Sequence, residues 1–400
     1  MKNMLYKAKG ALALTLAVSI CGAQCVPVFA AEALSAAQQG VQVTPVKELT
    51  EEEKAALQLP KLTAEEALAK AKKHSPDLRE IQDTLDYLDD TLDDIDRSAG
   101  GTVTVPNVEY KKWVNDGWQK VVSAVYQAEQ GKKQARIGED LQNLGLEVSV
   151  KSYFTSIKSN EDTLSLTKKN AEIQKKLYEQ GQEKNRLGLL SKYNLNQLEI
   201  AAKQAQDNVA LLEASMEQLY IKLNDLMGEK ADARFEYVYD VTYTLSLPME
   251  QYLNAALKKD LTIQLKELAL DSAKFTKNYV GESNTRLDSN TQEYNYDTAK
   301  RNLKTAKTDK EMAIRNAYLQ LQQMETQITS AQSSLTKAQA DYRAAQINLR
   351  AGNVTKTAVE QAEMGVVSAQ NSLNQLIYNY DMLVFTFENP SLLGNTAQAQ

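Results

Sequence analysis

The sequence predicts a mainly α fold: a tandem pair of very long antiparallel α-helical coiled-coil hairpins, with a small mixed α/β region partway along their length. Residues 107–247 contain no proline, nor do residues 249–389, and such long stretches without a helix breaker are typical of long helices. Apolar residues recur at alternating spacings of three and four, the pattern of coiled-coil packing. A segment centred on Gly188 also recurs in the second half of the chain, centred on Gly352.

The repeat is clearest around these two glycines. When the chain is aligned with itself so that Gly188 falls on Gly352, six residues match identical ones without a gap. They are Tyr178, Gln182, Arg186, Gly188, Lys192 and Gln197, which match Tyr342, Gln346, Arg350, Gly352, Lys356 and Gln361. Glycine commonly follows the last residue of a helix because it adopts the left-handed conformation easily, and Ser191 and Thr355 are suited to cap the next helix. Each copy is therefore predicted to be a long helix, a tight turn and a second long helix.

The helices after both turns carry apolar seams. After the first turn the seam comprises Leu195, Leu198, Ala202, Ala205, Val209, Leu212, Met216, Leu219, Leu223 and Leu226. After the second turn it comprises Val359, Ala362, Val366, Ala369, Leu373, Leu376, Tyr380, Leu383 and Phe387. A seam with a period of 3.5 residues predicts side-by-side packing with a left-handed supercoil.

Residues 1–30 predict a secretory signal peptide. Three lysines precede a short apolar run at residues 11–20, and Val28 and Ala30 are small residues suited to cleavage after Ala30. The alternative, a membrane anchor, is disfavoured because the run is too short to span a bilayer comfortably. Cys21 and Cys25 both lie in this segment, so the mature chain is expected to have neither disulfides nor thiolate metal sites.

Composition shifts divide the remaining chain. We expect a flexible leader at residues 31–61, a first helical-hairpin repeat at 62–232, a second repeat at 233–389 and a disordered tail at 390–400. The first repeat begins with a capping box, Thr63 and Glu66. Its opening helix is interrupted at Pro76 and places five aspartates on its solvent side: Asp86, Asp89, Asp90, Asp93 and Asp94.

Two polar breaks and one strand interrupt the helices. Residues 98–108 form the first break, and one helix is expected from about 110 to 187, with a closely packed seam at Gly131, Gly138 and Gly145. Residues 235–245 alternate with period two and predict a strand with one aromatic face. Residues 279–293 form the second break, after which we expect the helix to resume near Tyr294.

The sequence offers little for catalysis or metal binding. His74 is the one histidine, and no glycine-rich phosphate loop or nucleophile motif is present. Carboxylates are numerous, but on coiled helices they normally form a solvated face. We therefore expect a protein that is not an enzyme and has no cofactor. The net charge of -6 becomes about -9 after signal removal, which disfavours nucleic acid as a partner.

Two motifs resemble the TolC-like outer-membrane efflux protein family. Residues 62–79, LTAEEALAKAKKHSPDLR, look like the family's opening helix, and residues 186–199, RLGLLSKYNLNQLE, look like its turn. The tandem hairpins also match the family's architecture. The resemblance implies that the chain is one protomer of a homotrimeric α-barrel that conducts exported molecules. It further implies docking to a periplasmic adaptor and an inner-membrane pump at the turns, through Gly188, Leu189, Leu190, Ser191, Lys192, Gly352, Asn353, Val354, Thr355 and Lys356.

The sequence departs from the family in two ways. The two breaks are too short to hold the hairpins of membrane strands that family members carry, so membrane contact stays open. The acid expected six residues after each turn glycine is replaced by Asn194 and Ala358, which leaves Glu199, Glu360 and Glu363 as candidate lumen acids.

Three functions therefore remain in consideration. The first is an efflux or export conduit; the second is a periplasmic or extracellular coiled-coil scaffold without transport; the third is an unrelated exported coiled coil. All three place the protein outside the cytoplasm, in the periplasm or at the cell surface, and the resemblance implies the outer membrane.

Overall fold

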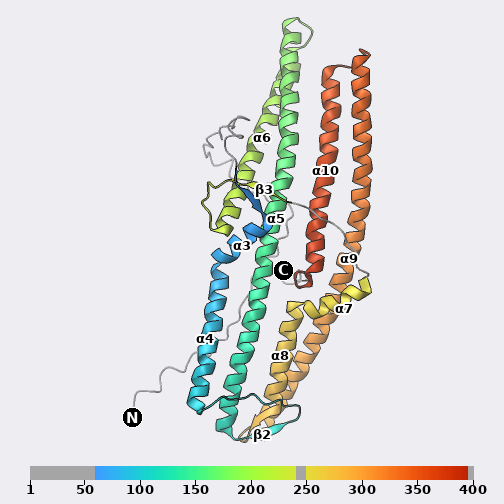
Figure 1. Ribbon diagram of the computed structural model, residues 1–400. Helices are drawn as coiled ribbons and strands as arrows, with labels where there is room; N and C mark the ends of the chain where they lie inside the picture. Colours follow the sequence, from blue (N-terminus) through green and yellow to red (C-terminus); the bar gives the residue numbers. More distant parts are fainter. Residues whose placement is uncertain (1–58, 240–248, 395–400) are drawn as a thin grey trace.

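The structure is a computed structural model that describes residues 59–239 and 249–394 (Figure 1). The predicted signal peptide, nearly all of the leader, residues 240–245 of the predicted strand and the last six residues lie outside the described residues.

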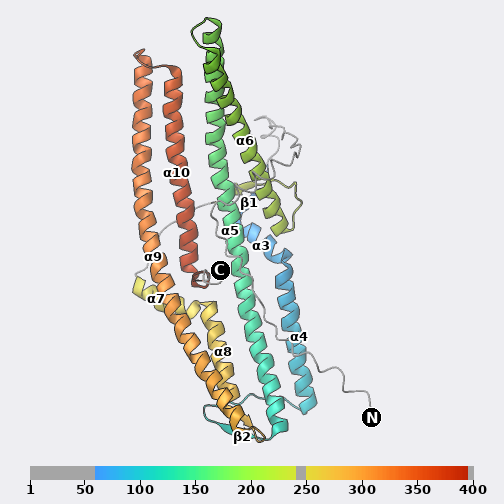
Figure 2. The same cartoon turned by 180° about the vertical axis from the view of Figure 1, so that it is seen from behind.

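Two long helical hairpins dominate the molecule, which confirms the predicted fold class. The first pairs α5 (Asp116–Arg186) with α6 (Lys192–Met227), and the second pairs α9 (Arg286–Arg350) with α10 (Lys356–Glu388). At 1.5 Å per residue, the 71 residues of α5 extend over about 106 Å. Both hairpins point their turns in the same direction (Figures 1 and 2).

Four shorter helices complete a layer that is four helices wide. They are α3 (Ala64–His74), α4 (Pro76–Ala99), α7 (Met249–Lys259) and α8 (Leu261–Asn278). Near the turns the order across the layer is α6, α5, α10, α9, and at the opposite end it is α4, α5, α8, α9 (Figures 1 and 2). One edge of the layer is therefore α6 continued by α4, and the other edge is α9 along its whole length.

Local capping explains where the first helices begin. The Thr63 hydroxyl accepts a hydrogen bond from the Glu66 amide at 3.2 Å, and the Glu66 carboxylate accepts one from the Thr63 amide at 3.0 Å, which confirms the capping box. Ser75 then caps α4, and Pro76 occupies its first turn, where the missing amide hydrogen costs nothing. The five aspartates of α4 are exposed, as predicted.

Two helix boundaries differ from the prediction. Helix α9 begins at Arg286, well before Tyr294, because Thr285 and Asp288 form a second capping box within the polar break. Helix α5 begins at Asp116 because Lys112–Val114 form strand β2 and Asn115 caps the helix. At the second break, polar composition suggested a loop as far as Tyr294, but there the polar residues satisfy the free amides of a helix end. Helix α5, by contrast, starts later than the predicted position near Tyr110.

Two small parallel sheets join the repeats. Strand β1 (Lys61–Thr63) pairs with β3 (Glu236–Val238) partway along the molecule, and β2 pairs with β4 (Tyr279–Gly281) at the end opposite the turns (Figure 1). The mixed α/β region is confirmed for the described residues. Tyr237 of β3 is buried and Glu236 is exposed, which agrees with the predicted alternation.

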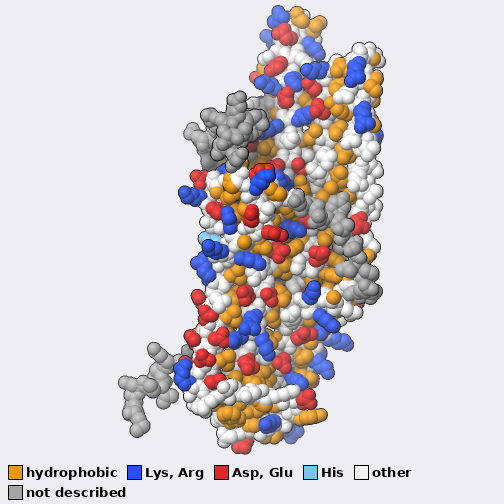
Figure 3. All heavy atoms as spheres, in the orientation of Figure 1, with side chains coloured by type: hydrophobic (Ala, Val, Ile, Leu, Met, Phe, Trp, Pro, Cys, Tyr) orange, Lys and Arg blue, Asp and Glu red, His pale blue; other side chains and the backbone are white. Residues whose placement is uncertain are grey.

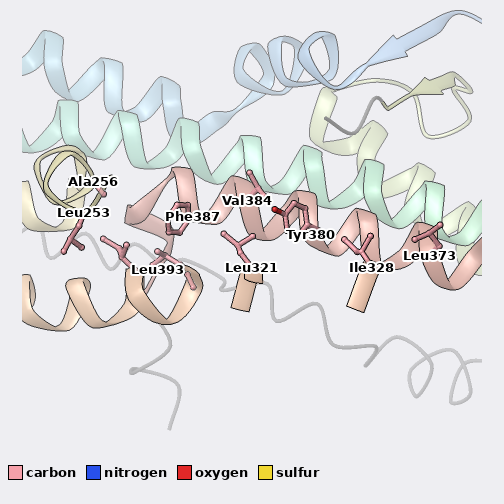
Figure 4. Close-up of a cluster of buried hydrophobic side chains, with 11 residues drawn as sticks. Leu253, Ala256, Leu321, Ile328, Leu373, Tyr380, Val384, Phe387 and Leu393 are labelled. Carbon is pink, nitrogen blue, oxygen red and sulfur yellow. The ribbon is translucent and has the colours of Figure 1, made fainter. Parts of the chain in front are cut away.

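The apolar core is divided into separate clusters rather than forming one centre. Between α9 and α10, Leu321 and Ile328 pack with Tyr380 and Phe387, and Leu253 of α7 belongs to the same cluster (Figure 4). A second cluster joins α3, α5, α6 and β3, and a third lies near β2 and β4. Because the buried residues lie in narrow seams, most of each helix surface is exposed to solvent, which agrees with the mean hydropathy of -0.46.

Two further expectations are corrected. A side chain at Gly131 would meet Leu88 of α4 at 3.3 Å, but nothing lies within 4 Å of such a side chain at Gly138 or Gly145, so the predicted glycine seam is wrong for those two. Residues 390–394 belong to the structure rather than to a disordered tail. Pro390–Leu392 form the 3₁₀ helix η1, and Ser391 and Leu393 are buried.

Candidate docking tips and the seam between the hairpins

The first turn is held by a glycine in the left-handed conformation. Gly188 has φ 73°, and the amide of Leu189 donates to the carbonyl of Lys184 at 2.8 Å. This bond closes the last turn of α5 in the manner of a Schellman motif. Ser191 then caps α6 by accepting from the Asn194 amide at 3.2 Å. The chain thus reverses direction within Gly188–Ser191.

The second turn has the same geometry. Gly352 has φ 75°, the Asn353 amide donates to the Asn348 carbonyl at 2.9 Å, and Thr355 caps α10 by accepting from the Ala358 amide at 3.3 Å. A side chain at either glycine would meet nothing within 4 Å. Glycine is therefore required at both turns by the backbone conformation and not by crowding.

Both tips expose apolar side chains. Leu187, Leu189 and Tyr193 are 62%, 74% and 72% exposed at the first tip, and Ile347 is 64% exposed just below the second. A cluster of exposed apolar residues at the end of a long hairpin is a common feature of protein contact surfaces. The sequence identified the turn residues correctly as turns, but it did not single out Leu187 or Tyr193.

The two tips do not reach the same height. Both α5 and α9 begin near the β2–β4 sheet, but α5 has 71 residues and α9 has 65. The difference of six residues corresponds to about 9 Å of helix. The first tip accordingly extends beyond the second (Figures 1 and 2).

Polar side chains, rather than an apolar seam, line the contact between the hairpins. Along α5, Lys151 pairs with Asp381 at 2.9 Å, Lys169 pairs with Glu363, and Lys176 pairs with Glu360 at 3.0 Å. Hydrogen bonds to Glu172 and Glu360 raise the pKa of Lys176 above its ordinary value. Ionic contacts thus extend from midway along the molecule toward the tips.

Asp162 is the centre of this contact. Its carboxylate accepts hydrogen bonds from the Asn374 amide at 2.8 Å and the Tyr378 hydroxyl at 3.3 Å, and its carbonyl accepts from the Asn371 amide at 2.7 Å. Burial, with the nearby Asp162 carboxylate, raises the pKa of Tyr378 to about 12. The hydroxyl therefore stays protonated and can donate.

A heptad pattern in α5 could have revealed this seam. Asp162, Lys169 and Lys176 follow one another at seven-residue spacing, and this spacing places them on one face of a supercoiled helix. The sequence analysis followed apolar heptads and gave no weight to a polar one. The partners lie about two hundred residues away in sequence, so only the folded arrangement identifies them.

The three candidate lumen acids lie in different settings. Glu360 and Glu363 are paired with lysines of α5 between the hairpins, whereas Glu199 is exposed on α6 near the first tip. Across residues 59–239 and 249–394, no three His, Cys, Asp or Glu residues are grouped so as to hold a metal ion. Within the same residues, no helix is sufficiently long and apolar to cross a membrane.

Comparison with solved structures finds the same arrangement of helices in several outer membrane proteins. The outer membrane protein VceC from Vibrio cholerae superposes with a TM-score of 0.61 at 15% identity, covering 83% of this chain and 96% of that one. The CmeC outer membrane channel of Campylobacter jejuni gives 0.63 at 14% identity, covering 83% and 86%. CusC gives 0.62 at 13% identity, covering 83% and 93%.

The chain has the TolC-like fold. The resemblance inferred from the two sequence motifs is thereby confirmed at the level of the fold. No protein-family model matches the sequence, and no curated protein does. VceC is an outer membrane protein of Vibrio cholerae, and CmeC is an outer membrane channel of Campylobacter jejuni.

Proposed function

We propose that the protein is a component of an envelope efflux or export system, in which three copies form a helical conduit. The observation that carries the proposal is the TolC-like fold, shared with channel proteins over 83% of the chain. The arrangement of side chains agrees with it. Both faces of the helical layer are exposed to solvent, and its apolar residues lie in narrow seams between the helices. Such a layer is suited to form the wall of a water-filled tube.

The tips are the proposed docking end for an adaptor and an inner-membrane pump. The contact residues are Gly188, Leu189, Leu190, Ser191 and Lys192 with Gly352, Asn353, Val354, Thr355 and Lys356. Exposed Leu187 and Tyr193 extend this surface. Among the acids, Glu199 is our candidate for the lumen, because Glu360 and Glu363 already neutralise lysines.

Export by living cells tests the proposal. Cells that lack the chain should accumulate a fluorescent efflux dye, and wild-type protein should restore export. The double variant Gly188→Val and Gly352→Val should accumulate normally but export poorly, because both tips are distorted. Light scattering on the processed protein should give the mass of three chains. A stable monomer with unchanged dye export in deletion cells would instead support a scaffold without transport.

A further inference from the structure

We propose that the α4 and α6 edge of one copy packs against α9 of a second copy, with Asp90 facing Arg301 and Ile221 facing Ser330. The proposal rests on the proposed conduit and deepens it by assigning the residues that join the copies. Both edges end the four-helix layer, and each carries features that the fold of a single copy does not use.

The outer face of α6 carries an unused apolar stripe. Helix α6 packs on α5 through a seam that includes Met216 and Leu223. Ile200, Leu211 and Ile221 lie on the opposite face and are 42%, 45% and 41% exposed. Ile200 and Ile221 are separated by three full heptads. Leu211 lies between the two heptad positions that come between them, residues 207 and 214. The stripe therefore follows the supercoil of the helix, as a second coiled-coil seam does.

The outer face of α9 offers the complementary surface. Its inner seam on α10 contains Ile314, Leu321 and Ile328 at seven-residue spacing. A second series with seven-residue spacing starts at Met312, two residues before Ile314, and runs along the other side of α9. Its members are all exposed, and they are small or apolar: Met312, Leu319, Thr326, Ser333, Ala340 and Ile347. Beside them is an open hollow of about 500 Å³ lined by Gln322, Glu325, Thr326, Thr329, Ser330 and Ser333. A large apolar side chain fits such a hollow as a knob fits a hole.

Charges are complementary at the other end of the two edges. The 24 residues of α4 contain nine Asp and Glu residues but two Arg residues, and acidic side chains follow this edge in Figure 3. Asp90 lies opposite the Leu85 and Leu88 seam, is exposed, and has no ion pair with any described residue. On α9, Lys300, Arg301 and Lys304 are exposed, and the recorded side-chain contact of Arg301 is a hydrogen bond to Thr298 at 2.9 Å.

Contacts within one copy fix the relative heights of Asp90 and Arg301. Asp89 pairs with Lys132, which stands about 24 Å along α5 from Asp116. Asp116 accepts a hydrogen bond from the Ser283 amide at 3.1 Å, so α5 and α9 begin at similar heights. The same rise of about 24 Å along α9 from Arg286 reaches the neighbourhood of Arg301. Asp90 and Arg301 are thus level with each other, on opposite edges.

A second set of contacts fixes the heights near the turns. Glu213 of α6 pairs with Lys168 of α5 at 2.9 Å, the Asp162 carbonyl accepts from Asn371 of α10 at 2.7 Å, and Tyr380 of α10 donates to Glu325 of α9 at 2.6 Å. Followed from helix to helix at 1.5 Å per residue, these contacts place Ile221 level with about residue 330 of α9, beside the hollow. Rotation about an axis parallel to the helices preserves height, so level residues meet when identical copies close into a ring.

Engineered disulfides test the proposal directly. The full chain is used with Cys21→Ala and Cys25→Ala, and carries Asp90→Cys with Arg301→Cys, or Ile221→Cys with Ser330→Cys. Within one copy each pair lies on opposite edges of the layer, about 25 Å or more apart, which is far beyond disulfide reach. Oxidation should therefore link copies into dimers and closed trimers. An equimolar mixture of the two single-cysteine variants should stop at dimers. The control pair, Arg136→Cys with Asp90→Cys, places one cysteine on central helix α5 and should not link copies.

Charge reversal provides an independent measurement that does not depend on oxidation. Arg301→Glu should weaken assembly about tenfold or more, measured as the protein concentration at which trimers dissociate, and Asp90→Arg should do the same. Combining the two should restore assembly, because every interface contains both edges. Arg136→Glu, an equivalent change away from the edges, should leave assembly unchanged.

The possible outcomes separate this proposal from the proposed function. Trimers that neither cross-link at these pairs nor respond to charge reversal would overturn the assigned edges and leave the conduit standing. A protein that is monomeric at all concentrations would overturn both. Cross-linking at both heights, with rescue by the double reversal, would establish the interface.

Discussion

The amine of Lys310 lies 3.0 Å from the carboxylate of Asp260, and both side chains are buried. Asp260 also caps α8 by accepting from the Ile263 amide at 2.8 Å, and Lys310 donates to the carbonyls of Pro390 and Leu393. Ser391 completes the site by accepting from the Leu261 amide at 2.8 Å. This one ion pair therefore joins α9, the start of α8 and the C-terminal turn.

Removing the lysine should be costly. Lys310→Met is expected to lower the free energy of unfolding by about 3–5 kcal/mol, because it leaves the Asp260 carboxylate buried without a counter-charge. Adding Asp260→Asn should recover part of the loss, since the amide is neutral and its oxygen can still cap α8. Denaturant unfolding followed by circular dichroism checks both variants. Equal stability of Lys310→Met and wild type would show that the site is hydrated and the pair unimportant.

Replacing Tyr237 with phenylalanine should not lower the stability of the protein. Its hydroxyl is buried without a hydrogen-bond partner among the described residues, so Tyr237→Phe should leave stability at pH 8 unchanged or raise it by up to about 1 kcal/mol.

The same residue makes stability depend on alkaline pH. Burial raises the pKa of Tyr237 to about 12. Between pH 10 and 12 the unfolded chain loses this proton before the folded one does, so stability is complete below pH 10 and falls as pH rises. Between pH 8 and pH 11, the free energy of unfolding of Tyr237→Phe should fall by about 1 kcal/mol less than that of the wild type. Tyr294→Phe, at an exposed tyrosine, is the control and should match wild type at both values.

The turn glycines should respond to substitution in the opposite sense from a glycine within a helix. Gly352→Ala is expected to destabilise by about 1 kcal/mol, since φ at this position is 75°. Gly365→Ala, within α10 and with open space around it, should stabilise by about 0.5–1 kcal/mol. Thermal melts of the two variants give the comparison. If both substitutions stabilise the protein, the left-handed backbone conformation assigned to Gly352 is contradicted.

Adjacent leucines of α6 should behave differently. Leu212 belongs to the seam on α5 and is half-buried, so Leu212→Asp should lower the free energy of unfolding by about 2 kcal/mol or more through a partly buried, unpaired charge. Leu211 lies on the outer stripe and is 45% exposed, so Leu211→Asp should alter the stability of an isolated copy by less than about 1 kcal/mol. Urea unfolding followed by helix content distinguishes the two variants, when it is measured at protein concentrations too low for the copies to assemble. Similar losses for both would contradict the assignment of faces.

Asp162 should contribute to the contact between the hairpins. Asp162→Ala removes the acceptor for Asn374 and Tyr378 and should cost about 1–3 kcal/mol. Asp140→Ala, at an exposed position of the same helix α5, is the matched control and should be neutral. Hydrogen exchange of α10 near residue 374 should increase in the first variant alone. Unchanged exchange there would contradict a stabilising role for the Asp162 carboxylate in the contact.

Local and periodic signals in the sequence were enough to predict the helices and their turns. Long stretches free of proline, apolar heptads and two glycine turns specify hairpins, because helix propensity and left-handed backbone conformation are decided within a few residues. The capping box at Thr63 and Glu66 was predictable for the same reason. The repeat then showed that the second hairpin copies the first.

The contacts between those elements could be read only from the folded chain. Lys176 and Glu360, or Lys310 and Asp260, pair across long separations in sequence, and no local signal distinguishes such charges from solvated ones. Whether Gly138 lines a seam, and whether residues 390–394 are ordered, likewise depended on which neighbour each met. A helix forms from its own residues, but a polar side chain acquires its partner only when two helices have been brought together, so the seam between the hairpins could be seen only in the folded chain.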